Sequence, residues 1–410
     1  MKHIHRAACA VGAVLLLAGC SSTPTAGVAG LAGGSGSIKI QAGTGEIPVL
    51  QEVAEDFTAD TGVEVEFVQR EVNAQTLSNF ISQSPTGQAP DILVSPHDNL
   101  GQLAANGVVV PVELGERAED FTENARAAVV YNGVSYGVPF AIENVALLRN
   151  NELTTAEPAT FDELRAEGHR IMEERGIEYP FTVSQSPETG DPYHLYALQT
   201  SFGAEVFERT EEGEYTSNLT MGGEEGHRFA RYLAELGWTA DLRTSMTPDI
   251  AKESFLNGQS AFHLGGPWEL ADIEAAGMDV SVLPVPPAGN EEARPFVGVQ
   301  AFFVNANAQN PVAAQDFAAN YLTRPETQSA LYESTGRPPA STVAVDRMEG
   351  DPLRSAYAQI AETGLPMPAI PEMGAVWSFW GTTENAIVDG RGDPVELWDR
   401  MIDNIEGQIS

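Results

Sequence analysis

Cysteine is nearly absent from this chain of 410 residues, which contains only Cys9 and Cys20. Both lie within residues 1–20, so the rest of the chain carries no thiol. Disulfide bonds, thiolate catalysis and cysteine metal sites are therefore excluded from the rest of the chain. Its stability must come from packing and from polar contacts.

Basic residues are also scarce. The chain has 22 lysines and arginines against 58 aspartates and glutamates, which gives a formal net charge of -36, and its lysines are at positions 2, 39 and 252. Phosphate binding needs a basic surface, so we expect neither nucleic acids nor polyanionic substrates as partners. The acidity itself is typical of a solvated surface adapted to a salty or alkaline exterior.

An apolar run covers residues 7–18, but it is too short for a membrane-spanning helix, which needs about 20 residues. Lys2 and Arg6 precede the run, and it closes on Leu17-Ala18-Gly19-Cys20, the pattern of a bacterial lipoprotein signal. We expect residues 1–19 to be a signal peptide and an acylated Cys20 to hold the mature chain on the outer face of the cytoplasmic membrane. Residues 20–36 are mostly small and uncharged, which predicts a flexible tether.

Motifs for cofactors, metals and nucleophilic catalysis are missing or incomplete. Gly43 and Gly45 lie between an expected strand and an expected helix, as in a dinucleotide-binding turn, but Pro48 stands in place of the third glycine. Such a turn still offers free backbone N–H groups to an electronegative ligand group, for example a sugar hydroxyl. No Gly-x-Ser-x-Gly elbow occurs, and the histidines at positions 97, 169, 194, 227 and 263 lack metal-ligand spacing. We expect no cofactor and no metal.

What the chain does contain is an alternation of strand and helix patterns. The first series has strands at 37–41, 63–67 and 92–94, and helices at 49–60, 75–82 and after Asp98. The second has strands at 180–183, 261–264 and 280–283, and helices at 161–174, near Tyr193, Arg228 and Ile250, and at 395–409. Extended apolar segments at 137–148 and 296–304 resemble crossings between the two series. Since the body is too long for one core, the sequence predicts two α/β lobes with central sheets.

Aromatic residues follow turn signals at several expected helix starts. Tyr193, Trp268, Trp377 and Trp380 can project from such places into a cleft, where a sugar ring would stack on them. Nearby carboxylates and amides would then bind the hydroxyls at the edge of the ring. Most tryptophans belong to the core instead, and we assign Trp238 and Trp398 to it.

Six segments of the chain form a recognisable series: APDIL (89–93) with HD (97–98), VPFAIE (138–143), NGQSA (257–261), GPW (266–268), PFVGV (295–299), and PAIPEM (368–373) continuing to Trp377. Together they resemble the maltose/maltodextrin-binding proteins of ABC sugar importers, and the likeness runs from about Ile38 to the C-terminus. The resemblance implies a two-lobed periplasmic-binding-protein-like fold of type II. A first lobe of residues 37–141 and 302–347 and a second of 145–296 and 352–410 would meet at hinge crossings near 142–146 and 297–302, with the sugar bound between the lobes.

The resemblance also assigns ligand-binding positions. Asp98 and Glu143 from the first lobe, and Asp191, where better-known members have glutamate, would accept hydrogen bonds from hydroxyls. Tyr193, Trp268 and Trp377 would be stacking platforms from the second lobe. Several polar anchors of the family are changed: Thr44 and Gly45 replace an Asp-Lys pair, Ser95 a tryptophan, and Asn99 and Gly381 two arginines. Further candidates are Thr44, Glu46, Ser95, Asn99 and Trp380, the last of which supplies a substitute ring or packs behind Trp377.

The resemblance implies a monomeric binding protein, not an enzyme, that captures maltose or maltodextrin and delivers it to an ABC permease. It would touch the membrane only through its lipid anchor. The changed anchors leave trehalose or another glucoside as alternative ligands, and the acidic cleft residues leave a cationic solute. A glycoside hydrolase with a carboxylate pair such as Glu143 and Asp191 is the alternative from another class.

Overall fold

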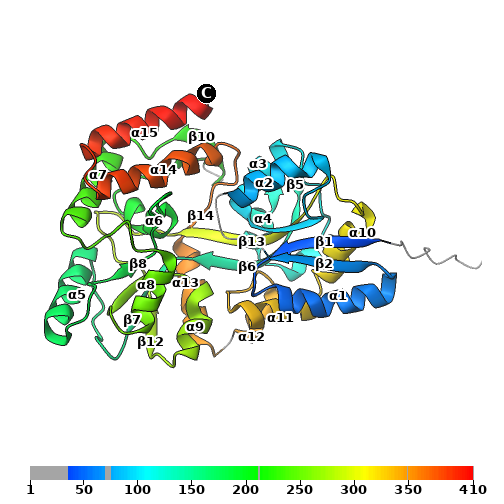
Figure 1. The fold of residues 1–410 in the computed structure, drawn as a ribbon, viewed down its shortest axis with the longest axis horizontal. Coiled ribbons are helices and arrows are strands. Elements are labelled where there is room, and N and C mark those ends of the chain that lie inside the picture. Colours follow the sequence, from blue (N-terminus) through cyan, green and yellow to red (C-terminus); the bar gives the residue numbers. More distant parts are fainter. Residues whose placement is uncertain (1–35, 70–74, 211–212, 349, 410) are drawn as a thin grey trace, which may run out of the picture.

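The computed structural model describes residues 36–69, 75–210, 213–348 and 350–409. The expected signal peptide, Cys20 and residues 20–35 of the expected tether lie outside the described residues. In Figure 1 the described chain forms two lobes side by side, each built on a β-sheet. Among the described residues, no helix combines the length and the apolar character needed to cross a membrane.

The sheet of the first lobe has six strands. Their order is β14 (Leu365–Pro366), β13 (Phe296–Val304), β3 (Ile92–Pro96), β1 (Ser37–Ala42) and β2 (Glu64–Gln69), with β6 (Gly137–Asn144) also paired to β13. Strands β1, β2 and β3 run parallel to one another, whereas β13 is antiparallel to β3 and β6. The strands predicted at 37–41, 63–67 and 92–94 are therefore present, within one or two residues.

The inner strands β3, β6 and β13 are buried on both faces of this sheet, whereas the edge strand β2 is mostly exposed. Alternate residues of a strand enter different cores. Ile92 and Val94 pack with Phe57 and other residues of one core, whereas Leu93 packs with Phe80 in another. The helices of this part of the chain are α1 (Ile47–Thr61), α2 (Gln75–Gln83), α3 (Leu100–Ala105), α4 (Glu123–Ala128), α10 (Pro311–Asp316), α11 (Pro325–Thr335) and α12 (Thr342–Arg347), with the short helical turns η1 (Ser84–Thr86), η2 (His97–Asn99), η3 (Gly115–Asp120) and η5 (Phe317–Tyr321). A small hairpin joins β4 (Val130–Tyr131) to β5 (Val134–Ser135).

The sheet of the second lobe has four strands, in the order β12 (Val280–Leu283), β7 (Ala146–Asn150), β11 (Phe262–Gly265) and β8 (Thr182–Val183). Leu147 enters the large core of this lobe, whereas its neighbours Ala146 and Leu148 enter a smaller core on the other face. The helices are α5 (Phe161–Arg175), α6 (Pro192–Thr200), α7 (Gly223–Trp238), α8 (Pro248–Leu256), α9 (Leu270–Ala275), α13 (Pro352–Thr363), α14 (Met373–Val388) and α15 (Pro394–Ile409), with the turn η4 (Pro267–Glu269). Strands β9 (Phe207–Arg209) and β10 (Tyr215–Leu219) pair separately.

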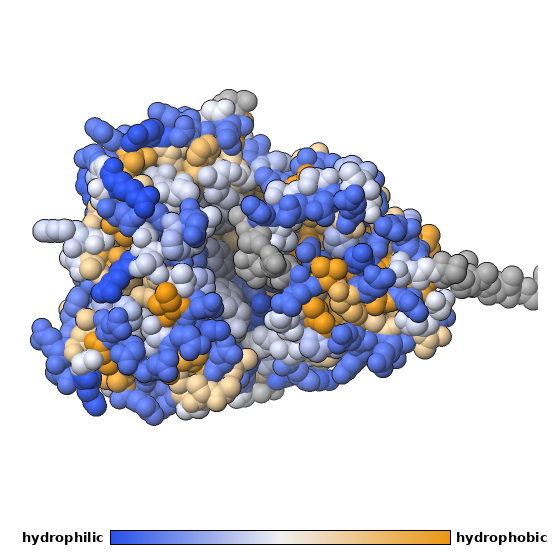
Figure 2. Space-filling model, in the orientation of Figure 1, coloured by the Kyte–Doolittle hydropathy of each residue, from blue (hydrophilic) through white to orange (hydrophobic). Residues whose placement is uncertain are grey.

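Two extended segments connect the lobes. β13 covers the predicted segment 296–304, and all of its residues are buried. β6 leads through Val145 directly into β7, which belongs to the other sheet. In the space-filling view the surface is hollowed between the lobes that these segments join (Figure 2). The two crossings thus lie at the base of an interlobe space.

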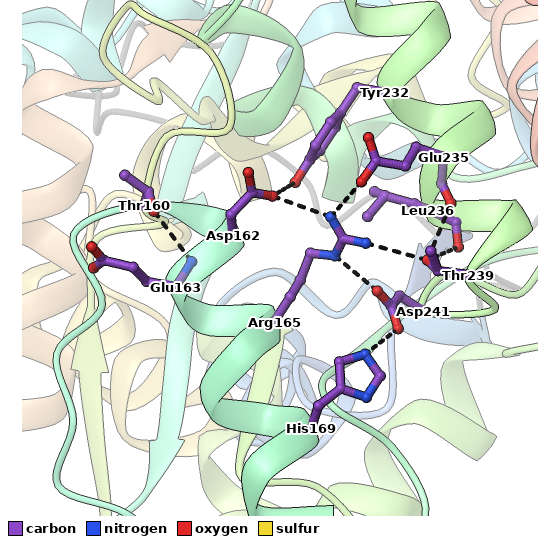
Figure 3. Close-up of polar contacts among 10 residues, drawn as sticks. All are labelled: Thr160, Asp162, Glu163, Arg165, His169, Tyr232, Glu235, Leu236, Thr239 and Asp241. Carbon is purple, nitrogen blue, oxygen red and sulfur yellow. Dashed lines mark hydrogen bonds and ion pairs between the residues drawn. The ribbon is translucent and has the colours of Figure 1, made fainter.

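A polar network around Arg165 of α5 fixes the end of α7 in the second lobe (Figure 3). Its guanidinium donates hydrogen bonds to Glu235 Oε1 (2.9 Å), Asp241 Oδ2 (2.8 Å) and Thr239 Oγ1 (3.3 Å). Partial burial lowers the pKa of Arg165, but the hydrogen bonds to Glu235 and Asp241 raise it above its ordinary value. His169 Nε2 lies 2.7 Å from the other oxygen of Asp241. His169 therefore belongs to the same polar network as Arg165.

The two tryptophans predicted as core residues differ. Trp398 of α15 is fully buried, which confirms its assignment. Trp238 is 89% exposed, so its assignment to the core is wrong. α7 buries the face that carries Phe229 and Leu233. Trp238 comes five residues after Leu233, which at about 100° per residue points it about 140° away from that face.

Candidate functional site

A cavity of about 1100 Å³ lies between the two lobes. From the first lobe α2, the end of β3, η2 and α3 line it, and from the second lobe the segment 185–193 and the start of α14. Six of the sequence-derived candidates are among its lining residues: Ser95, Asp98, Asn99, Asp191, Tyr193 and Trp377. The structure thus gathers candidates that lie up to 282 positions apart in the chain around one space.

Asp98 meets Trp377 across this cavity. The Trp377 indole N–H donates a hydrogen bond to Asp98 Oδ2 at 3.1 Å, so one residue of each lobe takes part. The other oxygen, Oδ1, is buried and accepts no side-chain hydrogen bond within the described residues. Burial raises the pKa of Asp98 to about 6, although hydrogen bonds from Trp377 and from two backbone N–H groups oppose the shift. Asp98 thus lies at the cavity wall with one oxygen that has no side-chain partner.

The turn that carries Asp98 is held firmly. His97, the preceding residue, is buried, and burial lowers its pKa to about 4, so its ring is neutral near pH 7. Its Nδ1 accepts the backbone N–H of Val299, in the crossing strand β13, at 3.0 Å. Asn99 donates from Nδ2 to Ser95 Oγ at 2.9 Å. Ser95 and Asn99, which we expect to replace a tryptophan and an arginine of the family, therefore bind each other at the cavity wall.

Asp191 begins helix α6 and faces the cavity from the second lobe. Its side chain accepts the backbone N–H of His194 at 3.4 Å, which is the usual role of aspartate at a helix start, and Pro192 fits the first turn. Its Oδ2 accepts a hydrogen bond from Ser184 Oγ at 2.7 Å and lies 2.8 Å from His194 Nδ1. The local sequence Asp-Pro thus fixes both the helix start and the direction of the carboxylate.

The aromatic candidates form a continuous row. Trp268 packs on Tyr193 (ring centroids 6.2 Å apart), Tyr193 on Phe296 (6.3 Å) and Phe296 on Trp377 (6.3 Å). Trp268 and Trp377 are both partly exposed. Trp380 lies at 25° to Trp377 with centroids 5.4 Å apart and is fully buried, so it packs behind Trp377 and offers no exposed ring.

Glu143 and Glu46 share a cation that the sequence did not point to. Arg337 forms ion pairs with Glu46 Oε1 (2.9 Å) and with Glu143 Oε1, and Gln300 Nε2 donates to Glu143 Oε2 at 3.0 Å. Glu46 is 1% exposed and folds over Gly43, so it fills the turn where we expected free N–H groups. Neither glutamate is among the residues lining the cavity. Thr44 is exposed and is not among them either.

Glu143 nevertheless belongs to the same electrostatic surroundings as the cavity. Burial is the main cause that raises the pKa of the Tyr193 hydroxyl well above its ordinary value, and the charges of Glu143, Asp98 and Asp191 add to it. Three candidate acceptors therefore surround one candidate platform. Three further residues belong to the site: Arg337 and Gln300, which hold Glu143, and Phe296, which lies between Tyr193 and Trp377. No spacing pattern in the sequence marks them as site residues.

Comparison with known proteins gives consistent results. The family model described as bacterial extracellular solute-binding protein matches residues 52–360. A maltotriose-binding protein of Pyrococcus abyssi is 30% identical over 369 residues, which cover 85% of this chain and 76% of that protein. A maltooligosaccharide ABC transporter solute-binding lipoprotein of Streptococcus pneumoniae R6 is 27% identical over 336 residues, which cover 80% of this chain and 78% of that protein. The solved structure of a Thermus thermophilus maltotriose-binding protein with maltotriose bound superimposes with a TM-score of 0.81 at 31% identity, covering 91% of this chain and 100% of the other.

Proposed function

Because this chain belongs to the bacterial extracellular solute-binding protein family, we propose that it captures a maltodextrin-type oligosaccharide between its lobes and delivers it to the permease of an ABC importer. The named ligands of its relatives, maltotriose and maltooligosaccharides, support this ligand class. The observation that carries the proposal is the row of rings from Trp268 to Trp377 beside the Asp98 oxygen that has no side-chain partner.

The site residues fit the two surfaces of a sugar ring. Tyr193, Trp268 and Trp377 present flat faces that would stack on its C–H groups. Asp98 and Asp191 would accept hydrogen bonds from its hydroxyls, and charge-assisted bonds of this kind are the stronger ones. Glu143, which is held by Arg337 and Gln300 and does not line the cavity, would contribute through its charge. Trp380 would support Trp377 from behind, while Ser95 and Asn99 would contact the sugar from the cavity wall. A micromolar dissociation constant needs about 8 kcal/mol, which a few such contacts can supply.

Closure would bring these groups together. We propose a first lobe of residues 37–141 and 302–347 and a second of 145–296 and 352–410, which rotate about crossings near 142–146 and 297–302. The hydrogen bond between Trp377 and Asp98 joins these two units across the cavity and supports a hinge of this kind. A sugar that touches both lobes favours the closed form, because it binds that form more tightly.

The second class considered, a glycoside hydrolase, is less well supported. The family consists of solute-binding proteins. Glu143, one half of the carboxylate pair considered for hydrolysis, is already held by Arg337 and Gln300. We therefore propose binding without any covalent step. Export, acylation at Cys20 and attachment to the outer face of the cytoplasmic membrane complete the proposal, which the lipoprotein name of the pneumococcal relative supports.

Titration calorimetry of the body from residue 37 onward tests the function. The ligand panel is maltose, maltotriose, trehalose, sucrose and a cyclodextrin, with the polyamine spermidine as the cationic alternative. We expect the tightest binding for a maltodextrin and recovery of the sugar unchanged after incubation. New reducing ends would instead identify a hydrolase, and binding of spermidine alone would identify a carrier of cations.

Replacing Trp268 by alanine should weaken sugar binding by more than about 1 kcal/mol, because stacking is lost from a partly exposed ring. Trp268 packs on Tyr193 at the edge of the row, so the thermal unfolding midpoint should change little. Calorimetry and thermal unfolding of the same sample measure both effects. If alanine at the buried Trp398 weakened binding equally, the row would not be the binding surface.

Sugar binding should weaken as the pH falls below about 6. The pKa of Asp98 is raised to about 6, so its carboxylate is present above that pH and is protonated below it. Protonation removes an acceptor on which both Trp377 and the sugar would depend. We expect a loss of up to about tenfold per pH unit in affinity, measured by calorimetry between pH 4.5 and 7.5. Asp98→Asn should bind more weakly and show no such acid limb.

A further inference from the structure

Two histidine–carboxylate pairs lie behind the aromatic row. In the first, His194 Nδ1 lies 2.8 Å from Asp191 Oδ2. In the second, His263 Nε2 lies 2.7 Å from Glu269 Oε2, and its Nδ1 lies 2.9 Å from Thr182 Oγ1. Glu269 directly follows Trp268 in the chain, and Asp191 precedes Tyr193 by two residues. Each pair is therefore attached to one of the rings proposed to hold sugar.

His194 connects the two pairs. Its ring contacts both platforms edge-on, with centroids 5.7 Å from Trp268 at 86° and 5.7 Å from Tyr193 at 78°. The negative charge of Glu269 acts on it as well as that of Asp191. The buried carboxyl of Glu384 from α14 is also close enough for its charge and that of Asp191 to interact, and a hydrogen bond from Trp380 partly opposes the rise in its pKa. The charged and titratable groups around His194 are thus Asp191, Glu269, Glu384 and, through Glu269, His263.

The balance of these effects favours the charged form of His194. Burial disfavours the charged ring, but Asp191 and Glu269 outweigh it and raise the pKa of His194 above its ordinary value near 6.5. A neutral ring would leave the Asp191 carboxylate with Ser184 and a long backbone contact as its remaining partners. The Asp191 side chain is 20% exposed, and a charged His194 ring holds its carboxylate by a charge-assisted contact, which is stronger than a neutral one.

We propose that His194 is a positioning residue for sugar binding: it fixes the Asp191 carboxylate and the Trp268 and Tyr193 rings in the arrangement that receives the ligand. The inference rests on the proposed function of the same cavity. His194 need not touch the sugar. Its effect passes through the carboxylate that it pairs with and through the two rings that it supports.

A pH profile distinguishes this role from simple packing. The cation is present at low pH and is lost as the pH rises through the folded-state pKa of His194, so affinity should fall on the alkaline side. If the pKa of His194 differs by one unit between the free and the sugar-bound protein, the affinity changes about tenfold. We therefore expect a loss of affinity of about tenfold at high pH. Asp98 limits binding on the acid side, so the two limbs lie at opposite ends of the profile.

The experiment measures maltotriose affinity of the mature chain between pH 6.5 and 9.5. His194→Asn keeps an N–H group near Asp191 without the charge, and His227→Asn is the matched control, since His227 pairs with Asp399 away from the cavity at 2.5 Å. We expect the wild type and His227→Asn to lose about tenfold in affinity toward high pH. His194→Asn should be about tenfold weaker at pH 7 and independent of pH above it. Thermal unfolding of each variant confirms that it is folded.

Glu384→Gln separates the two groups that could titrate beside Asp191. Burial raises the pKa of Glu384 well above its ordinary value, so its ionisation could also weaken binding at high pH. If Glu384→Gln keeps the alkaline limb and His194→Asn abolishes it, the inference holds. If His194→Asn keeps the limb, the inference is wrong, whether or not Glu384→Gln abolishes it. A wild type that binds with a flat profile contradicts this inference alone, whereas one that binds no sugar at any pH contradicts the proposed function.

Discussion

Arg337→Met should lower the free energy of unfolding by about 3–5 kcal/mol, because it leaves two buried carboxylates without their shared cation. Glu46 is 1% exposed and Glu143 is 7% exposed, and among the described residues Gln300 would remain as the only other polar side chain bound to Glu143. Methionine keeps the length and the apolar stem of the side chain, so the loss reflects charge rather than volume. Urea denaturation near pH 7 measures it.

Two further variants test the cause. Arg347→Met removes an arginine from the exposed pair with Glu333, whose side chains are 53% and 60% exposed, and should change stability by less than about 0.5 kcal/mol. The double variant Arg337→Met with Glu143→Gln should recover part of the loss, since one buried charge goes with the cation. Similar losses from Arg337→Met and Arg347→Met would show that burial of the carboxylates does not matter.

Trp398→Ala should cost about 3–5 kcal/mol of stability, the range found when large aromatic side chains are removed from a core. Trp398 is fully buried, packs edge-on against Phe229 at 5.6 Å, and donates its indole N–H to the backbone oxygen of Met221 at 2.8 Å. Alanine leaves a cavity and an unpaired carbonyl. Sugar affinity of the folded fraction should stay the same, because α15 lies away from the interlobe cavity.

The chain provides a matched control for this experiment. Trp238→Ala removes the same side chain from a position that is 89% exposed, so stability should change by less than about 0.5 kcal/mol. Chemical denaturation of both variants under one set of conditions gives the comparison. A large loss from Trp238→Ala would mean that its ring is covered in the folded protein in solution.

Elements with a clear local pattern could be predicted from the sequence. β13 occupies 296–304 as expected, and α15 begins one residue before the predicted 395–409. These patterns are contiguous, so burial of one strand or of one helix face leaves a readable period. Trp238 shows the limit, because it is the last residue of a helix whose apolar face it does not share. The sequence left Trp380 either as a substitute ring in the cleft or as a residue behind Trp377. Only the packing of α14 in the structure decides for the second position.

The polar half of the site could be predicted only in part. Asp98 lies in one of the six segments that carry the family resemblance, Tyr193 follows a turn signal, and the structure brings both residues, with Asp191, to one cavity. Arg337 pairs with residues 291 and 194 positions earlier in the chain, and such a pair leaves no local trace. The surplus of acidic residues is typical of a solvated surface and does not indicate that an arginine would pair with buried glutamates.

The contact between Trp377 and Asp98 bears on how often the protein closes without a sugar. In the described structure the two lobes already exchange a hydrogen bond with each other, so part of the driving force for closure comes without cargo. An empty carrier that closes would compete with a loaded one for the importer. The importer must then distinguish the loaded carrier from the empty one by groups that the Trp377–Asp98 hydrogen bond does not engage. The second oxygen of Asp98 is the first of these groups.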